Sequence, residues 1–307
     1  MPKLNPRLIV IHSKRYYYPK MRHVRLVIAT CLALFAAAPR AAADPALWVT
    51  HSGNTTIYLF GTIHVLPAGT QWMDSQVRDA LSKSSEIWTE ADISNLSTSV
   101  TAIRHYGLHA GRPTEQRLPP AYRERYLEQV AQSGMPAALF AQAQPWLAEI
   151  LLAAASMQHA GAMGLGAEAS LIRFARDHAI ATPTFETLDS QFAMLADLPM
   201  PAQLASLEQQ IDDFSQAGQQ FDTLLAAWRA GDEASLDRVT NQDMRAHSQT
   251  IWTELILRRN ERFTARIEER LQGSGTAFVA IGAAHLTGST GVPALLRAHG
   301  YKVERIR

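Results

Sequence analysis

One short pattern, an apolar run followed by Gly-x-x-His, occurs near both ends of this 307-residue chain. The first copy runs from Gly61 to His64 and the second from Gly282 to His285. Glycine has no Cβ, so the backbone can turn sharply there and another group can approach the main chain closely. A single strand-end histidine is more often a hydrogen-bonded structural residue than a ligand. Because the pattern is repeated after two strong strand patterns, it favours a functional pair.

Acidic residues follow two other short strand patterns. Glu90 and Asp92 come directly after the run 87–89, and Glu186 lies near the end of the run 182–187. Glu90 and Asp92 are candidates for a site carboxylate, or they begin the next helix, where Asp92 would be a natural N-cap. Glu186 is a candidate second ligand or general base, or it only marks the start of the following helix.

Two imidazoles and one carboxylate form a ligand set that zinc, manganese or cobalt accepts as a divalent ion. We therefore predict that His64, Glu90 and His285 hold such an ion, with open positions left for water. Water bound to a metal ion has a lowered pKa and can attack a carbonyl carbon. The predicted chemistry is metal-dependent hydrolysis, above all of peptide bonds, with Glu186 or Asp92 assisting proton transfer.

A second function stays open on the same residues. The chain could be a non-catalytic binding or accessory protein for a peptide or a polysaccharide, with the histidines as hydrogen-bond partners. Other catalytic classes find no support, because the sequence has no Gly-x-Ser-x-Gly elbow and no P-loop or dinucleotide fingerprint. Cys31 is the only cysteine.

Apolar strands must position the two histidines. Residues 48–50 and 56–60 are β-rich runs around a small polar turn at 52–54, which predicts a hairpin leading into Gly61. The apolar run 276–281 is typical of a strand buried on both faces and leads into Gly282. Open α/β sheets bind ligands at the carboxyl ends of their strands, so both histidines are expected at one edge.

The remaining pattern predicts an α/β fold with a mixed, largely parallel sheet and a large helical insertion. Residues 74–84 have helical spacing between two strand patterns, which favours a parallel crossover. The insertion extends from about residue 96 to 272, interrupted by a third strand at 182–187. A helix at 295–300, closed by a glycine, and a strand at 301–306 end the chain. We expect one domain over 44–307.

The first 43 residues resemble an extension followed by a secretory signal. They hold eight Lys or Arg and no Asp or Glu, and an apolar run at 26–38 precedes Ala41, Ala42 and Ala43. The run is about half the length that a membrane-spanning helix needs. We expect translation to start at Met21, cleavage after Ala43, no stable transmembrane segment afterwards, and a periplasmic or secreted protein. Retention as an uncleaved anchor is the alternative.

The remaining chain is acidic. Taking the eight basic residues from the total of 29 leaves 21 against 28 acidic residues, a net charge of −7. Affinity for nucleic acid comes mainly from Lys and Arg, so this charge argues against a nucleic-acid partner. A peptide, a protein or a polysaccharide-related ligand is the expected partner.

An ordered series of motifs resembles the TraB/GumN family across nearly the whole mature chain. The motifs stand at 59–64, 90–92, 144–146, 185–187 with Gln191, at Arg259 and Asn260, at 278–288 and at 300–301. The resemblance implies a fold like that of the erythromycin-esterase and ChaN group. It also implies kinship to Tiki proteins, metal-dependent proteases that trim the amino terminus of secreted signalling proteins.

By the motif match, His64 and His285 are the paired histidines and Glu90 is a site carboxylate. Arg259 and Asn260 are the polar pair on a long helix, and Gly61, Asp92 and Gly282 support the site. Two positions depart from the family pattern. Gln144 stands where Lys is expected before Pro-Trp, and Gly166-Ala167-Glu168 stands where Gly-x-Asp is expected, so that Glu replaces Asp.

Overall fold

Five strands form one mixed sheet in the computed structural model, which describes residues 44–92, 96–161 and 164–307. The predicted signal segment and the start at Met21 lie outside these residues. The strands stand in the order β3-β4-β2-β1-β5. Their bounds are β1 Leu47–Ser52, β2 Asn54–Thr62, β3 Glu86–Trp88, β4 Ser274–Gly282 and β5 Val303–Arg305.

The pairing of the strands sets one functional edge. β1 and β2 form the predicted antiparallel hairpin, with Gly53 at a φ of +53° in the turn. β2 runs parallel to β4 along its whole length, ending at the pair Thr62 and Gly282, and β3 runs parallel to β4 on the other side. The carboxyl ends of β2, β4 and β3 therefore lie next to one another.

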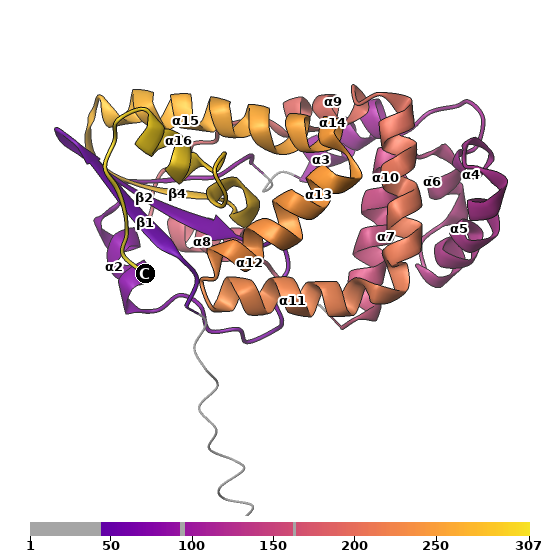
Figure 1. The fold of residues 1–307 in the computed structure, drawn as a ribbon, viewed down its shortest axis with the longest axis horizontal. Coiled ribbons are helices and arrows are strands. Elements are labelled where there is room, and N and C mark those ends of the chain that lie inside the picture. The colour runs from indigo at the N-terminus through magenta and orange to yellow at the C-terminus, as the bar shows by residue number, and fades with distance from the viewer. Residues whose placement is uncertain (1–43, 93–95, 162–163) are drawn as a thin grey trace, which may run out of the picture. The chain divides into compact units, whose positions relative to one another are not determined.

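Both faces of the sheet are covered, as the apolar run of β4 predicts. Phe278 and Ala280 point into one core with α2 (Ser75–Lys83), α8 (Ala167–Asp177) and α11 (Ala217–Arg229). Val279 and Ile281 point into the other core with α15 (Arg258–Leu271) and α16 (Val292–Ala298). Figure 1 shows α15 and α16 over the strands at one side of the sheet.

The predicted helical insertion lies between β3 and β4. Proline fits the first turn of a helix, and accordingly α5 and α7 begin at Pro120 and Pro145. α5, α6, α7 and α10 pack into a third apolar cluster at one end of the molecule (Figure 1). The other elements of the chain, in order, are α3 Leu96–Ala102, η1 Ile103–Gly107, α4 Thr114–Arg117, α5 Pro120–Gln132, α6 Ala137–Gln142, α7 Pro145–His159, α9 Leu188–Ala196, α10 Met200–Asp213, η2 Phe214–Gln216, α12 Glu233–Asp237, η3 Arg238–Gln242, α13 Asp243–His247, α14 Gln249–Trp252, η4 Thr253–Leu257 and η5 Ala283–Leu286.

The prediction of a third strand at 182–187 is wrong, because this segment does not form a continuous strand. The segment makes only isolated parallel bridges beside β3, from Ala181 to Glu86 and from Thr184 to Thr89. Pro183 accepts a hydrogen bond from Thr89 but has no N–H to donate, so a continuous ladder cannot form there.

The end of the chain follows the prediction with shifted bounds. The last helix ends at Ala298 and is followed by Gly300 at a φ of +93°, the conformation expected of a glycine after a helix. The last strand is shorter than predicted and pairs with β1 from Val303 to Arg305. Within the three described ranges, no helix has both the length and the apolar composition needed to cross a membrane.

One hydrogen bond ties the insertion to the strand that precedes His64. Trp228 of α11 is buried, and its indole Nε1–H donates to the carbonyl of Gly61 at 2.8 Å. Trp228→Phe keeps most of the ring but leaves this buried carbonyl without its partner, which costs about 1–3 kcal/mol. We expect the free energy of unfolding in urea to fall by that amount.

Trp146→Phe is the matched control, because Trp146 is also buried but its Nε1 has no hydrogen-bond partner in the described part of the chain. An equal loss of stability in both variants would show that ring size, rather than the bond to Gly61, accounts for the effect.

Candidate functional site

Three neighbouring strand ends bring His64, Glu90 and His285 to one edge of the sheet. His64 follows β2, Glu90 follows β3, and His285 lies in η5 directly after β4, the strand between them. The charge of His64 lowers the pKa of both Glu90 and His285, so the three groups lie within electrostatic range. His64 is exposed, whereas His285 is only 3% exposed.

Both motif glycines are sites of close approach. The backbone N–H of Gly282 donates to Glu90 Oε1 at 2.6 Å, and a Cβ on Gly282 would stand 3.0 Å from the same oxygen. A Cβ on Gly61 would stand 3.1 Å from the Cα of Ala283. Gly282 has a φ of −51°, so it is required here for space rather than for a left-handed backbone.

Arg259 of α15 is the centre of a buried network. Its Nη2 contacts Glu90 Oε2 at 2.5 Å and Glu186 Oε2 at 2.9 Å, and its Nε donates to Glu186. Its Nη1 donates to the carbonyl of Leu255 and to His285 Nε2, at 3.3 and 3.1 Å. All three nitrogens of the guanidinium therefore donate to acceptors within the protein.

Asn260 fixes the tautomer of His285. The amide nitrogen of Asn260 donates to the carbonyl of Thr290 at 2.8 Å, so its oxygen faces His285 Nδ1, 2.6 Å away. His285 therefore carries its proton on Nδ1, and the lone pair on Nε2 accepts from Arg259. The edge of the imidazole packs against Phe263, with ring centroids 5.2 Å apart.

The network sets the charge of each group. Burial alone would raise the pKa of Glu90, but the charges of His285 and Arg259 and the Gly282 N–H outweigh it and lower this pKa to about 2. Burial, with help from Arg259, lowers the pKa of His285 to about 4. Arg259 also holds the pKa of Glu186 below its usual value in spite of burial. At neutral pH both carboxylates are ionised and His285 is neutral.

The arrangement does not fit the predicted metal ion. No three His, Cys, Asp or Glu side chains of the described residues are grouped so that they could hold one. His285 Nε2 and Glu90 Oε1 lie 3.9 Å apart, but the guanidinium of Arg259 binds both side chains. An ion shared by His285 and Glu90 would have to displace Arg259. The metal stays a prediction from the sequence.

The comparisons with known proteins agree with this set of motifs. Residues 46–305 match the model of the TraB/PrgY/gumN family. The chain belongs to this family. It is similar to the uncharacterized protein YbaP of Escherichia coli K12, with 24% identity over 254 residues that cover 82% of this chain and 92% of that protein. YbaP of Shigella flexneri matches to the same extent.

No solved structure matches the chain significantly. The predicted likeness of this TraB/PrgY/gumN protein to the erythromycin-esterase and ChaN folds therefore stays a prediction, while its α/β class with a mixed sheet is confirmed.

The other two predicted acidic residues of this TraB/PrgY/gumN protein, Glu186 and Asp92, differ in their surroundings. Glu186 is an ion-pair partner of Arg259 and also accepts from Arg262 at 3.0 Å, and its backbone N–H donates to the carbonyl of Glu90. The N-cap of the following helix is Thr187, so Glu186 does not begin that helix. Asp92 is exposed, two residues beyond Glu90.

Glu168 is a site residue that sequence reasoning passed over in this TraB/PrgY/gumN protein. It is the second residue of α8, whose first backbone N–H, on Ala167, donates to the carbonyl of Ile63 at 3.2 Å. Its side chain is 8% exposed, and the charge of Glu90 acts on it. The signal in the sequence is the acidic residue two places after Gly166, where the family pattern has Gly-x-Asp.

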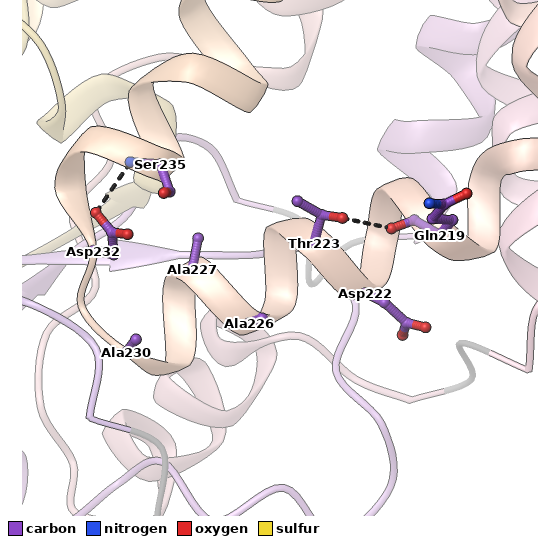
Figure 2. A pocket seen from close by; sticks show the side chains of 8 residues that line it. All are labelled: Gln219, Asp222, Thr223, Ala226, Ala227, Ala230, Asp232 and Ser235. Carbon is purple, nitrogen blue, oxygen red and sulfur yellow. Dashed lines mark hydrogen bonds between the residues drawn. The ribbon is translucent and has the colours of Figure 1, made fainter.

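A separate pocket of about 550 Å³ lies along α11 and the start of α12 (Figure 2). Its carboxylates are Asp222 and Asp232, and Asp232 already accepts the N–H of Ser235 as a helix cap. None of the strand-end residues lines this pocket, so it adds nothing to the site of this TraB/PrgY/gumN protein.

Because His285 is buried and neutral, the stability of the protein is predicted to depend on pH. Its folded pKa of about 4 lies below the ordinary 6.5, so its contribution to stability is complete above pH 6.5 and is lost as pH falls toward 4. The size is up to roughly 3 kcal/mol, from 1.36 kcal/mol per pKa unit. We expect the free energy of unfolding of the wild type to fall more steeply over this window than that of His285→Gln.

Urea unfolding at several pH values between 7 and 4 measures the difference. His51→Gln is the control, since His51 is exposed and its Nδ1 lies 3.0 Å from the hydroxyl of Thr56. Parallel curves for wild type and His285→Gln would contradict a buried neutral imidazole.

Proposed function

We propose that this chain is an exported hydrolase that cleaves peptide bonds at the strand ends carrying His64, Glu90 and His285. The observation that carries the proposal is the position of the two Gly-x-x-His motifs, which end adjacent parallel strands with Glu90 bonded across to Gly282. Groups separated in sequence are thereby held at the edge of the sheet where α/β proteins bind ligands.

The site divides into a fixed part and an accessible part. Arg259, Glu186, Asn260 and His285 are buried or nearly so and are bonded to one another, so they hold the geometry. His64 is exposed, and Glu90 retains 13% of its side-chain exposure. Substrate and water can therefore reach His64 beside an ionised carboxylate.

The accessible part supports general base catalysis. His64 can accept a proton from water as the water oxygen bonds to the carbonyl carbon, and the negative charge of Glu90 stabilises the imidazolium that forms. Because Glu90 is held at a pKa of about 2, it remains an anion throughout the neutral range. The step needs His64, Glu90 and one water molecule.

The proposed substrate class and the proposed export of the protein are supported by the family resemblance and by the sequence. The family resemblance favours peptide bonds, and the apolar run before Ala43 favours export to the periplasm or beyond. The net charge of −7 of the chain after residue 43 argues against a nucleic-acid substrate.

The first test is peptide cleavage with strand-end variants. His64→Ala is expected to reduce cleavage of a quenched fluorescent peptide library by about 100-fold or more, as is typical when a general base is removed. His64 is exposed, so its loss should leave the melting temperature nearly unchanged. His51→Ala is the control, because His51 lies in β1 beside Thr56, at the opposite end of β2 from His64. Cleavage that is equal in all three proteins would exclude this site.

The second test concerns the metal ion. Since Arg259 already binds Glu90 and His285, we expect cleavage to survive dialysis against EDTA and the purified protein to hold no stoichiometric divalent ion. Loss of activity that manganese, zinc or cobalt restores would show that an ion displaces Arg259. That result would favour the metal-dependent mechanism predicted from the sequence.

One observation favours the alternative of a non-catalytic binding protein. Nε, Nη1 and Nη2 of Arg259 all donate within the protein, so the network holds together without a reaction partner. A binding protein would be stabilised in a thermal-shift screen by peptides or oligosaccharides while cleaving none of them.

A further inference from the structure

The inference concerns Glu168 and rests on the proposed hydrolase function. Glu168 stands at the start of α8, which is docked onto the segment that leaves β2. A Cβ on Gly166 would lie 2.4 Å from the carbonyl oxygens of Ile63 and His64, and a Cβ on Gly164 would lie 2.1 Å from that of Leu66. The two glycines thus let the main chain before α8 lie directly against the residues around His64.

Glu168 differs from the other two carboxyl groups of this region. Glu90 has Arg259 and the Gly282 N–H, and Glu186 has Arg259 and Arg262. Glu168 is only 8% exposed, and its Oε1 is buried with no hydrogen-bond partner in the part of the chain that the structure describes. A buried, unpartnered carboxyl oxygen is costly unless the group is protonated or has a ligand to bind.

A helix N-terminus offers a simpler explanation for an acidic residue. Acidic side chains are common in the first turn of a helix because they interact favourably with its dipole. Such residues are normally solvated or bonded to the free backbone N–H groups. Burial with a bare Oε1 is unlike that arrangement, and the neighbouring charge that acts on Glu168 is that of Glu90, another carboxylate.

We infer that Glu168 is the general acid of this site, which protonates the leaving nitrogen while His64 takes the proton of the attacking water. Glu168 is 8% exposed and lies within electrostatic range of Glu90, and its helix is bonded to Ile63 next to His64. Its Oε1 has no hydrogen-bond partner among the described residues. The assignment adds a catalytic residue to the predicted His64, Glu90, His285 and Glu186.

The electrostatics agree with this division of roles. Burial, and next the charge of Glu90, raises the pKa of Glu168 to about 7, while that of Glu90 is about 2. Two carboxyl groups whose surroundings separate their pKa values in this way are suited to different roles, one as an acid and one as a fixed anion.

The proton balance of the step is complete. Water gives one proton to His64 as its oxygen bonds to the carbonyl carbon. Glu168 gives its proton to the amide nitrogen as the C–N bond breaks, which releases an amine and leaves the new carboxyl group on the other product. Transfer of the proton from the His64 imidazolium to the Glu168 carboxylate, directly or through water, restores the starting state.

The experiment compares kcat, KM and the pH profile of peptide-library cleavage in wild type, Glu168→Gln and Glu168→Asp. Glu168→Gln keeps the shape but has no proton to give, so kcat should fall about 100-fold or more, with KM little changed. Wild-type kcat should decrease as pH rises through about 7, and the residual activity of Glu168→Gln should lack this decrease. Glu168→Asp should retain part of the activity.

Glu149→Gln is the matched control. Glu149 lies in α7, bonds Ser206 of α10 and also has a pKa raised to about 7 by burial, but it is not part of the strand-end site. The Glu149→Gln variant should cleave the peptide library as the wild type does. Melting temperatures verify that each variant is folded.

The possible results separate the two proposals. An active wild type with an equally active Glu168→Gln, or with an unchanged pH profile, overturns the role of Glu168 alone. A folded wild type that cleaves no peptide overturns the hydrolase proposal, and the general acid falls with it.

Discussion

The ion pairs of Arg259 with Glu90 and Glu186 are the interaction on which the rest of the site depends. Burying two carboxylates near strand ends is costly unless their charges are compensated, and Arg259 compensates both, with its Nη2 in contact with each. The same group donates to His285 Nε2, so the imidazole need not be charged. Removing Arg259 would leave two buried anions together and would release the histidine. Arg259 thus contacts all three residues, while Gly282, Arg262 and Asn260 each hold one of them.

The helical insertion has a direct part in this geometry, because it brings each supporting group to the sheet. α15 supplies Arg259 and Asn260 above one face, and α11 supplies the Trp228 bond to Gly61. α8 supplies Glu168 against the segment after β2. A sheet with only the two Gly-x-x-His motifs would place the histidines but would leave their tautomers, charges and neighbours undetermined. The insertion is thus as much a component of the site as the strands are.

The sequence predicts the strand ends well, for a local reason. Apolar and β-branched runs with turn residues specify β1, β2 and β4, and parallel pairing then places His64, Glu90 and His285 at one edge. Contacts between distant segments have no such signature. Arg259 and Asn260 were singled out only by family resemblance, and their bonds to Glu186 and His285 could not be read from spacing. The strand predicted at 182–187 fails because Pro183 removes a donor from an otherwise β-like run. Glu168 was missed because its burial is created by the docking of α8.

The charge pattern explains why reactivity should lie at the rim of the site. Glu90, Glu186 and His285 are each bonded to Arg259 and to a further partner, and a bonded buried network resists changes of charge or position. A reaction needs groups whose protonation can change. His64 meets that need because it is exposed, and Glu168 meets it because no cation of the described residues acts on its charge. These two residues flank the same stretch of backbone after β2, so the fixed network and the labile pair are adjacent but separate. The fixed anion at Glu90 lies within electrostatic range of both and can stabilise a developing positive charge without taking the proton itself.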